Sequence, residues 1–146
     1  MGWLEPLRGE VVGLDTAPLI YFIEENPDYL NIIRPFFVAV DRGDFRVVTS
    51  IITLLEALVH PFRHGNTMLA QQYREILLNA SHVATIPLSC AIAEEAARLR
   101  ARYNVRTPDA IQMATAIRAG ASFFLTNDSH LPTIPELRVL VLDELK

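Results

Sequence analysis

The fold is decided near the start of the chain by the segment Val11-Val12-Gly13-Leu14-Asp15-Thr16. Its first four residues form a short, continuously apolar run, which is typical of a parallel strand covered on both faces. The run ends at Asp15-Thr16, and Pro18 follows at a position that the first turn of a helix tolerates. We therefore predict a buried strand that leads directly into a helix over residues 17–25.

The same alternation of strand and helix continues along the chain. Further strands are predicted over residues 46–50, 82–86, 122–126 and 137–142. Further helices are predicted over residues 29–41, 52–59, 67–79, 91–103 and 107–119. Pro61 is expected to end the third helix, Ser89 to cap the fifth, and Thr107 to cap the last one, which Pro108 and Asp109 then open. The pattern favours a single α/β domain over residues 1–146 with a mainly parallel sheet, in which residues 1–10 form an extension.

Composition excludes several classes of protein. Hydrophobic residues make up 51% and charged residues 21% of the 146 residues, which excludes a mainly disordered chain. No apolar stretch is long enough to cross a membrane, and the N-terminus shows no secretion signal, so we expect a cytoplasmic protein. The single cysteine, Cys90, excludes an intramolecular disulfide and is expected to be a small buried thiol. A net charge of −4 argues against binding nucleic acid through bulk positive charge.

Four acidic residues occupy positions that invite a functional explanation. Asp15 and Asp128 follow the first and fourth strands, and parallel strands all end at one edge of the sheet, where ligands bind. Glu56 is surrounded by apolar neighbours on its helix, so its carboxylate is expected to be at least half buried. Asp109 opens the last helix. Each also has a structural explanation: a turn residue, a helix cap, a first-turn charge, or a rotated helix that lets Glu56 reach solvent or an arginine.

Taken together, the four acids favour a metal site. Carboxylates gathered at one edge repel one another, and a divalent cation removes that repulsion. Oxygen ligands without a histidine or cysteine cluster suit Mg²⁺ or Mn²⁺, and Mg²⁺ commonly completes its shell with substrate phosphate. The sequence therefore points to chemistry on a phosphate ester. His60 and His64 are four residues apart, but Pro61 is expected to interrupt the helix that would align them, so no zinc pair is predicted.

The segments that carry these acids resemble the PIN-domain family, and most closely its VapC-type toxins from toxin–antitoxin pairs. The resembling segments are Gly13–Tyr21, Ser50–Glu56, Thr107–Ala116 and Phe124–Asp128, and the resemblance extends from Val11 to Leu142. The blocks Thr107-Pro108-Asp109-Ala110 and Thr126-Asn127-Asp128 are the more specific ones. The chain departs from the family pattern in two places: the extension over residues 1–10 and the dipeptide Ser129-His130. Neither place includes one of the four acids, so the departures concern the identity of the partner more than the chemistry.

The resemblance implies a three-layer α/β/α fold and a Mg²⁺- or Mn²⁺-dependent endoribonuclease in which a metal-activated water attacks RNA in line. It implies that the metal-binding and catalytic residues are Asp15, Glu56, Asp109 and Asp128. Residues expected to shape the site are Thr16, Thr107, Thr126 and Asn127, and residues able to touch the substrate are Arg106 and His130. A small antitoxin and a second copy of the chain are the implied protein partners, beside the RNA substrate.

Other functions remain open on the sequence alone. A stand-alone PIN nuclease acting on RNA or DNA would carry the same residues, and so far nothing separates the two substrates. A catalytically silent PIN fold that only binds a partner would be favoured by the loss of one acid, and none is lost. A phosphatase with an Asp-x-Asp pair after its first strand is disfavoured because the third position is Ala17.

Overall fold

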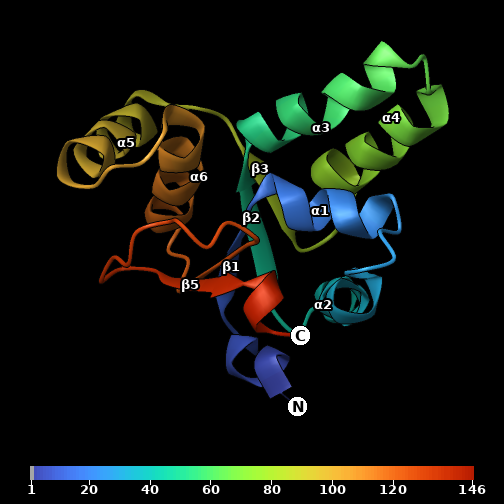
Figure 1. Cartoon of the computed structure of the whole chain (residues 1–146), viewed down its shortest axis with the longest axis horizontal. Coiled ribbons are helices and arrows are strands. Elements are labelled where there is room, and N and C mark those ends of the chain that lie inside the picture. Colours follow the sequence, from blue (N-terminus) through green and yellow to red (C-terminus); the bar gives the residue numbers. More distant parts are fainter. Residues whose placement is uncertain (1) are drawn as a thin grey trace.

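A five-stranded, all-parallel sheet runs through the middle of the computed structural model, which describes residues 2–146 (Figure 1). The strand order is β3-β2-β1-β4-β5, so the first strand of the chain lies at the centre. The strands are β1 (Val11–Leu14), β2 (Arg46–Ser50), β3 (Val83–Ile86), β4 (Phe123–Thr126) and β5 (Arg138–Val141). The predicted α/β class and parallel sheet are confirmed.

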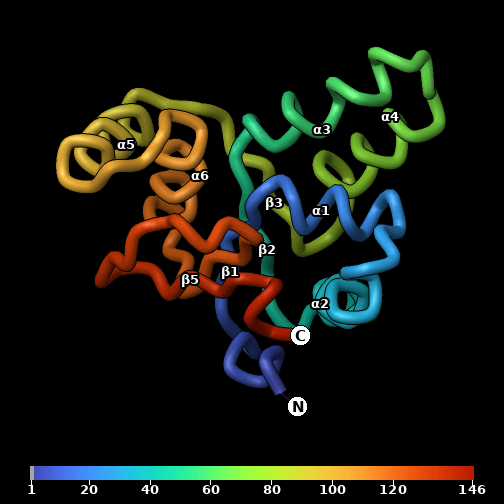
Figure 2. Tube along the Cα trace, viewed as in Figure 1, coloured from blue at the N-terminus to red at the C-terminus, as the bar shows by residue number. Residues whose placement is uncertain are grey.

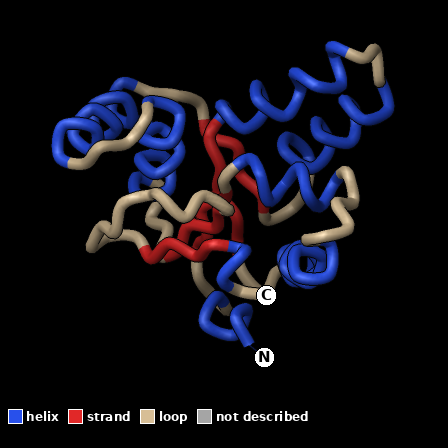
Figure 3. The backbone as a smooth tube through the Cα atoms, viewed as in Figure 1, coloured by secondary structure: helices blue, strands red, loops and turns tan. Residues whose placement is uncertain are grey.

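Helices cover both faces of the sheet, which gives three layers (Figure 3). One layer contains α1 (Thr16–Ile23), α2 (Leu30–Arg42), α3 (Ile51–Arg63), α4 (Thr67–Arg74) and the π-helical segment Glu75–Asn79. The other contains α5 (Cys90–Arg102) and α6 (Thr107–Arg118). Short 3₁₀ helices lie over Gly2–Leu7 and Leu142–Glu144. Within residues 2–146, no helix combines the length and apolar character needed to cross a bilayer.

Alternation along β1 divides the core between the two layers. Val12 and Leu14 are fully buried against the side of α1 and α2, whereas Gly13 faces α6. An ideal Cβ on Gly13 would lie 2.6 Å from the Cβ of Ala116, so only glycine lets α6 approach β1 this closely. This close approach brings the helix that carries Asp109 onto the strand that leads directly to Asp15.

The predicted end of α3 was wrong. The helix does not stop before Pro61 but continues to Arg63, with Pro61 buried inside it. As Figure 2 shows, α3 therefore extends away from the sheet, and α4 returns beside it toward β3. Burial of the proline ring compensates for the backbone hydrogen bond that proline cannot donate. We call the paired helices α3 and α4 the arm.

Two further local predictions need correction. Cys90 is exposed, because α5 buries its face of Ile92, Ala96 and Leu99 while Cys90 is the first residue of the helix. Thr107 does not cap α6; Arg106 occupies the N-cap, and the Thr107 hydroxyl accepts a hydrogen bond from Arg100 instead (2.9 Å). Ser89 does cap α5, as predicted. The first residues pack on the domain: Leu7 is fully buried and Trp3 stacks on Phe36.

Candidate active site

Asp15 is held at the junction of two strands and a helix. Its backbone N–H donates to the carbonyl of Leu125 in β4 (2.9 Å). Its Oδ1 accepts from the backbone N–H of Thr16 (2.8 Å), which makes Asp15 the N-cap of α1, and its Oδ2 accepts from the Thr126 hydroxyl (2.7 Å). The carboxylate is therefore fixed at the edge where β1 and β4 end.

Asp128 lies beside Asp15 through a shared hydroxyl. The Thr126 hydroxyl that donates to Asp15 also accepts from the backbone N–H of Asp128 (3.0 Å). Oδ1 of Asp128 accepts from the backbone N–H of His130 (2.9 Å), and the His130 Nδ1 lies 3.5 Å from the same oxygen. Asp15 and the backbone of Asp128 thus share one hydroxyl at the edge where β1 and β4 end, while the Asp128 carboxylate contacts His130.

Glu56 reaches the same region from α3. Its Oε1 accepts a hydrogen bond from the Thr16 hydroxyl (2.6 Å). Glu56 is exposed, because α3 turns Thr53 and Ala57 toward the core instead. An exposed carboxylate needs no buried counter-ion, yet this one is tied to the residue that follows Asp15.

Asp109 approaches from the first turn of α6. The Arg106 Nε lies 3.6 Å from its Oδ2, but the Arg106 side chain is 83% exposed, so this ion pair contributes little to stability. Burial raises the pKa of Asp109 above its ordinary value of 3.8, the charge of Arg106 opposes this, and the negative charges of Asp128 and Glu56 add to it. The charges of Asp128 and Glu56 thus act on the Asp109 carboxyl group.

The four acids form a region of unbalanced negative charge. Burial is the main cause of a raised pKa at Asp15, which hydrogen bonds from Thr126 and Thr16 counteract and the charges of Asp109 and Glu56 reinforce. Among residues 2–146, no three Asp, Glu, His or Cys side chains are grouped so that they could hold one ion as they stand. The donor set still fits a hard divalent cation, because it consists of carboxylates whose mutual repulsion such a cation would relieve.

A buried polar network beneath the acids was not singled out in the sequence. The Gln112 amide of α6 donates to the Thr53 hydroxyl of α3 (2.6 Å), and its oxygen accepts from the backbone N–H of Ser50 (3.4 Å). Thr53 in turn shares a hydrogen bond with Thr49 (2.7 Å), whose hydroxyl donates to the Leu14 carbonyl (2.7 Å). The available signal was spacing: Gln112 lies three residues after Asp109, on the same side of α6.

Two of the residues expected to shape the site have other contacts. Thr107 interacts with Arg100, as described above. Asn127 donates to the Tyr21 hydroxyl (3.3 Å), and its Oδ1 accepts from the backbone N–H of Asp143 (2.9 Å). Asn127 therefore braces the C-terminal segment, whereas Thr16 and Thr126 contact the acids directly.

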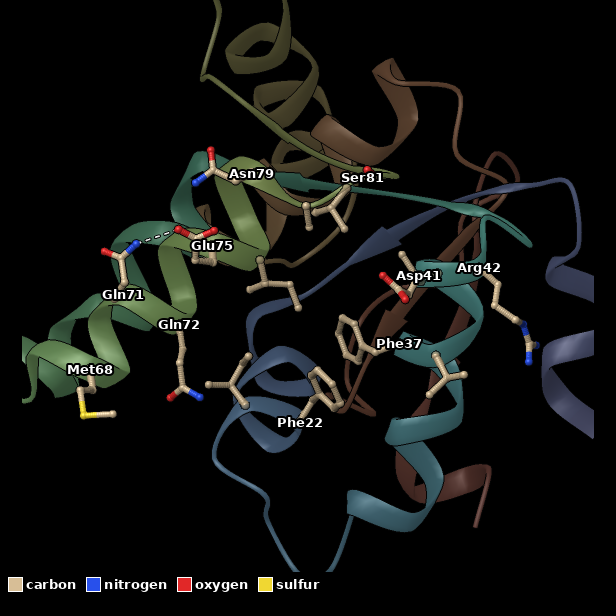
Figure 4. A pocket seen from close by; sticks show the side chains of 16 residues that line it. Phe22, Phe37, Asp41, Arg42, Met68, Gln71, Gln72, Glu75, Asn79 and Ser81 are labelled. Atoms are coloured by element: carbon tan, nitrogen blue, oxygen red, sulfur yellow. Dashed lines mark hydrogen bonds between the residues drawn. The ribbon is translucent and has the colours of Figure 1, made fainter.

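A separate apolar groove lies between the helices near the C-terminal end of α1 (Figure 4). Its volume is about 830 Å³, and it is bounded by α1, α2, α4 and the π-helical segment. Phe22 and Phe37 stack on each other within it, with ring centroids 4.3 Å apart. Its rim includes the residues Val38 and Met68, which are 47% and 80% exposed. A groove of this size and character suits a peptide segment with apolar side chains.

Comparison with known proteins gives the family. A model of the PIN domain matches residues 12–137. A search among curated proteins found no significant match.

Three solved structures are similar over most of their length. The first is VapBC2 from Rickettsia felis bound to a promoter DNA fragment, with a TM-score of 0.69 and 20% identity over 90% of this chain and 98% of that one. A toxin–antitoxin complex from Klebsiella pneumoniae has a TM-score of 0.66 and 25% identity over 87% and 94%. VapC20 from Mycobacterium tuberculosis, a toxin that cleaves the sarcin-ricin loop, has a TM-score of 0.64 and 15% identity over 78% and 86%.

Proposed function

This chain belongs to the PIN domain family, and from that premise we propose that it is a metal-dependent endoribonuclease, the toxin of a toxin–antitoxin pair. The observation that supports the proposal is the approach of four acids to one edge of the sheet, where their charges influence one another although no three of them are grouped to hold an ion as they stand: Asp15, Glu56, Asp109 and Asp128. They come from separate elements, and Arg106 is the one arginine or lysine of residues 2–146 that pairs with any of them.

Asp15 and Asp109 would be the principal ligands of Mg²⁺ or Mn²⁺, and Glu56 and Asp128 would hold a second ion or a bound water. A divalent ion supplies positive charge that admits a phosphodiester to an acidic site and stabilises the charge that develops on the phosphate oxygens. Thr16 and Thr126 hold the carboxylates in place by donating hydrogen bonds.

The residues for substrate contact lie at the rim. The Arg106 and His130 side chains are 83% and 94% exposed, so both can swing toward an RNA phosphate without disturbing the core. Arginine suits bidentate contact with phosphate. A chain with a net negative charge would then bind RNA through these local contacts and the bound metal ion, and not through its overall charge.

Asp15→Asn and Asp109→Asn test this proposal. Each is expected to abolish cleavage of RNA in Mg²⁺ or Mn²⁺ while the far-UV circular dichroism stays unchanged. Asp28→Asn, an exposed acid outside the site, is the matched control and is expected to cleave normally. Parallel assays on single-stranded DNA separate a ribonuclease from a general nuclease. Retained cleavage in either site variant would refute the ligand assignment, and a metal-binding wild-type chain without cleavage would favour a binding module.

We propose that the apolar groove receives the antitoxin. Two of the structural neighbours are described as toxin–antitoxin complexes or VapBC assemblies, and the groove leaves Val38 and Met68 exposed on this chain. The protein encoded by a short neighbouring reading frame is the probe. Val38→Asp is expected to weaken its binding, whereas Leu88→Asp, an equally exposed apolar position on the α5 side, is expected to leave it unchanged. Equal effects of both variants would place the partner elsewhere.

We also propose that two copies associate through the arm. Three apolar residues on α3 are 42–62% exposed and recur at helical spacing: Leu55, Val59 and Phe62. Such a stripe on an extended arm suits self-association. Sedimentation equilibrium is expected to show a dimer that Phe62→Asp converts to a monomer; a monomeric wild-type chain would contradict the proposal.

A further inference from the structure

The continuation of α3 through Pro61 aligns two histidines. His60 and His64 are four residues apart at the end of this helix, so they lie on the same face, one turn apart. Their rings are in contact, with centroids 4.4 Å apart and an interplanar angle of 76°. Both residues are exposed, and in residues 2–146 no side-chain hydrogen bond or ion pair occupies either ring. Both imidazoles can therefore offer a nitrogen to a ligand.

We propose that His60 and His64 form a surface binding site for a divalent transition-metal ion, Zn²⁺ in particular. Imidazole nitrogen is a preferred ligand of Zn²⁺, at about 2.0–2.1 Å. A tetrahedral ion bound by one nitrogen of each ring would hold the centroids about 5 Å apart, estimated from that bond length. The observed 4.4 Å differs little from this value, and exposed side chains can rotate by that amount. Water would complete the coordination.

This site differs in chemistry from the acidic cluster. Carboxylate oxygens suit Mg²⁺ and Mn²⁺, whereas imidazoles select Zn²⁺, Cu²⁺ and Ni²⁺. It is also separate in space: Glu56 precedes His60 by one helical turn and His64 by two, which places Glu56 about 12 Å from His64 along the axis. An ion held by both histidines therefore lies beyond the acidic cluster along α3, and the chain would carry two cation sites of different selectivity.

Binding at the two histidines would also have a local structural effect. A chelate between positions i and i+4 ties the last turn of α3 together. His64 is the C-cap residue, and Pro61 removes one backbone donor from this stretch. Zinc would therefore stiffen the tip of the arm, next to the exposed Phe62.

Zinc titration of the full chain tests the site. The background is Cys90→Ser, because the exposed thiol is itself a zinc ligand, with excess Mg²⁺ present to occupy the carboxylates. Calorimetry is expected to show one Zn²⁺ per chain. Replacing either histidine, in His60→Asn or His64→Asn, is expected to weaken binding at least about tenfold, because a single imidazole loses the chelate.

His82→Asn is the matched control, since His82 is also exposed but lies outside the arm. It is expected to bind Zn²⁺ like the parent. Circular dichroism confirms that each variant is folded. Undetectable binding in the parent, unchanged binding in both arm variants, or an equal loss in the control would each overturn the proposal, whatever the outcome of the cleavage assays.

Discussion

The close approach of β1 and α6 predicts a large effect from a single methyl group. In Gly13→Ala the new Cβ would lie 2.6 Å from the Cβ of Ala116 and 2.9 Å from Cδ1 of Phe124. Carbon atoms in contact normally lie about 3.5–4.0 Å apart, so about 1 Å must be gained. The Ala116 Cβ is fixed to the helix backbone and Phe124 is buried, so α6 itself has to move.

Overpacking of this kind costs about 1–3 kcal/mol, and we expect the upper end because the nearest clash cannot be relieved by a rotamer change. For a chain of this length, a loss of about 3 kcal/mol lowers the melting temperature by about 6–12 °C. Urea unfolding followed by circular dichroism measures the change. Because Asp15 ends β1 and Asp109 opens α6, the thermal stabilisation by Mn²⁺ should fall as well.

A double-mutant cycle isolates the cause. Ala116→Gly alone is expected to cost about 1 kcal/mol, from glycine in a helix. Adding it to Gly13→Ala removes the shorter, fixed contact and leaves only the 2.9 Å contact with the Phe124 ring. The double variant should therefore be more stable than additivity predicts by at least about 1 kcal/mol. Additive losses, or an unchanged Gly13→Ala protein, would refute the assigned contact.

Three other predictions concern the site and the network beneath it. The pKa values of Asp15 and Asp109 are raised in the folded state, so their contribution to stability is present below pH 3.8 and is lost as the pH rises through the raised values. Urea unfolding of the metal-free protein should therefore show a loss of stability over this pH range. The Asp15→Asn variant should lose less. Mn²⁺ at about 100 times its Kd should raise the free energy of unfolding by about 2.7 kcal/mol at pH 7 and by less at acidic pH, where the carboxylates are protonated. An equal gain at both pH values would contradict carboxylate ligands. Gln112→Leu should lower the free energy of unfolding by about 1–3 kcal/mol in urea, because the buried backbone N–H of Ser50 loses its acceptor. Gln72→Leu, at an exposed position, is the control. Equal stability of the two variants would refute a structural role for the Gln112 amide.

Much of the fold could be predicted from local signals, and the failures have identifiable causes. Apolar runs gave the strands, and β1 and β2 begin and end where predicted. The end of α3 was predicted wrongly at Pro61, because the rule for proline considers only the backbone. Burial of the ring in the arm offsets the lost hydrogen bond. The N-cap of α6 was predicted wrongly at Thr107, because the hydroxyl of Thr107 accepts a hydrogen bond from Arg100, which lies on another helix.

The candidate site was predictable where topology alone positions a residue. Asp15 and Asp128 follow neighbouring parallel strands, so their proximity is a consequence of strand order. The orientation of Glu56 was not predictable, because apolar residues lie on several sides of it along α3. The side that faces inward is set by the buried hydrogen bond between Thr53 and Gln112, which joins residues 59 positions apart.

Hydroxyl groups allow this site to keep its negative charge. A guanidinium paired with each acid would hold the carboxylates equally well, but it would leave no net charge to attract a cation. Thr16 donates to Glu56 while its backbone N–H binds Asp15, and Thr126 donates to Asp15 while accepting from the backbone of Asp128. Each threonine thus links two acids without neutralising either. The repulsion that remains destabilises the metal-free fold, and it is the same free energy that a bound divalent ion would recover.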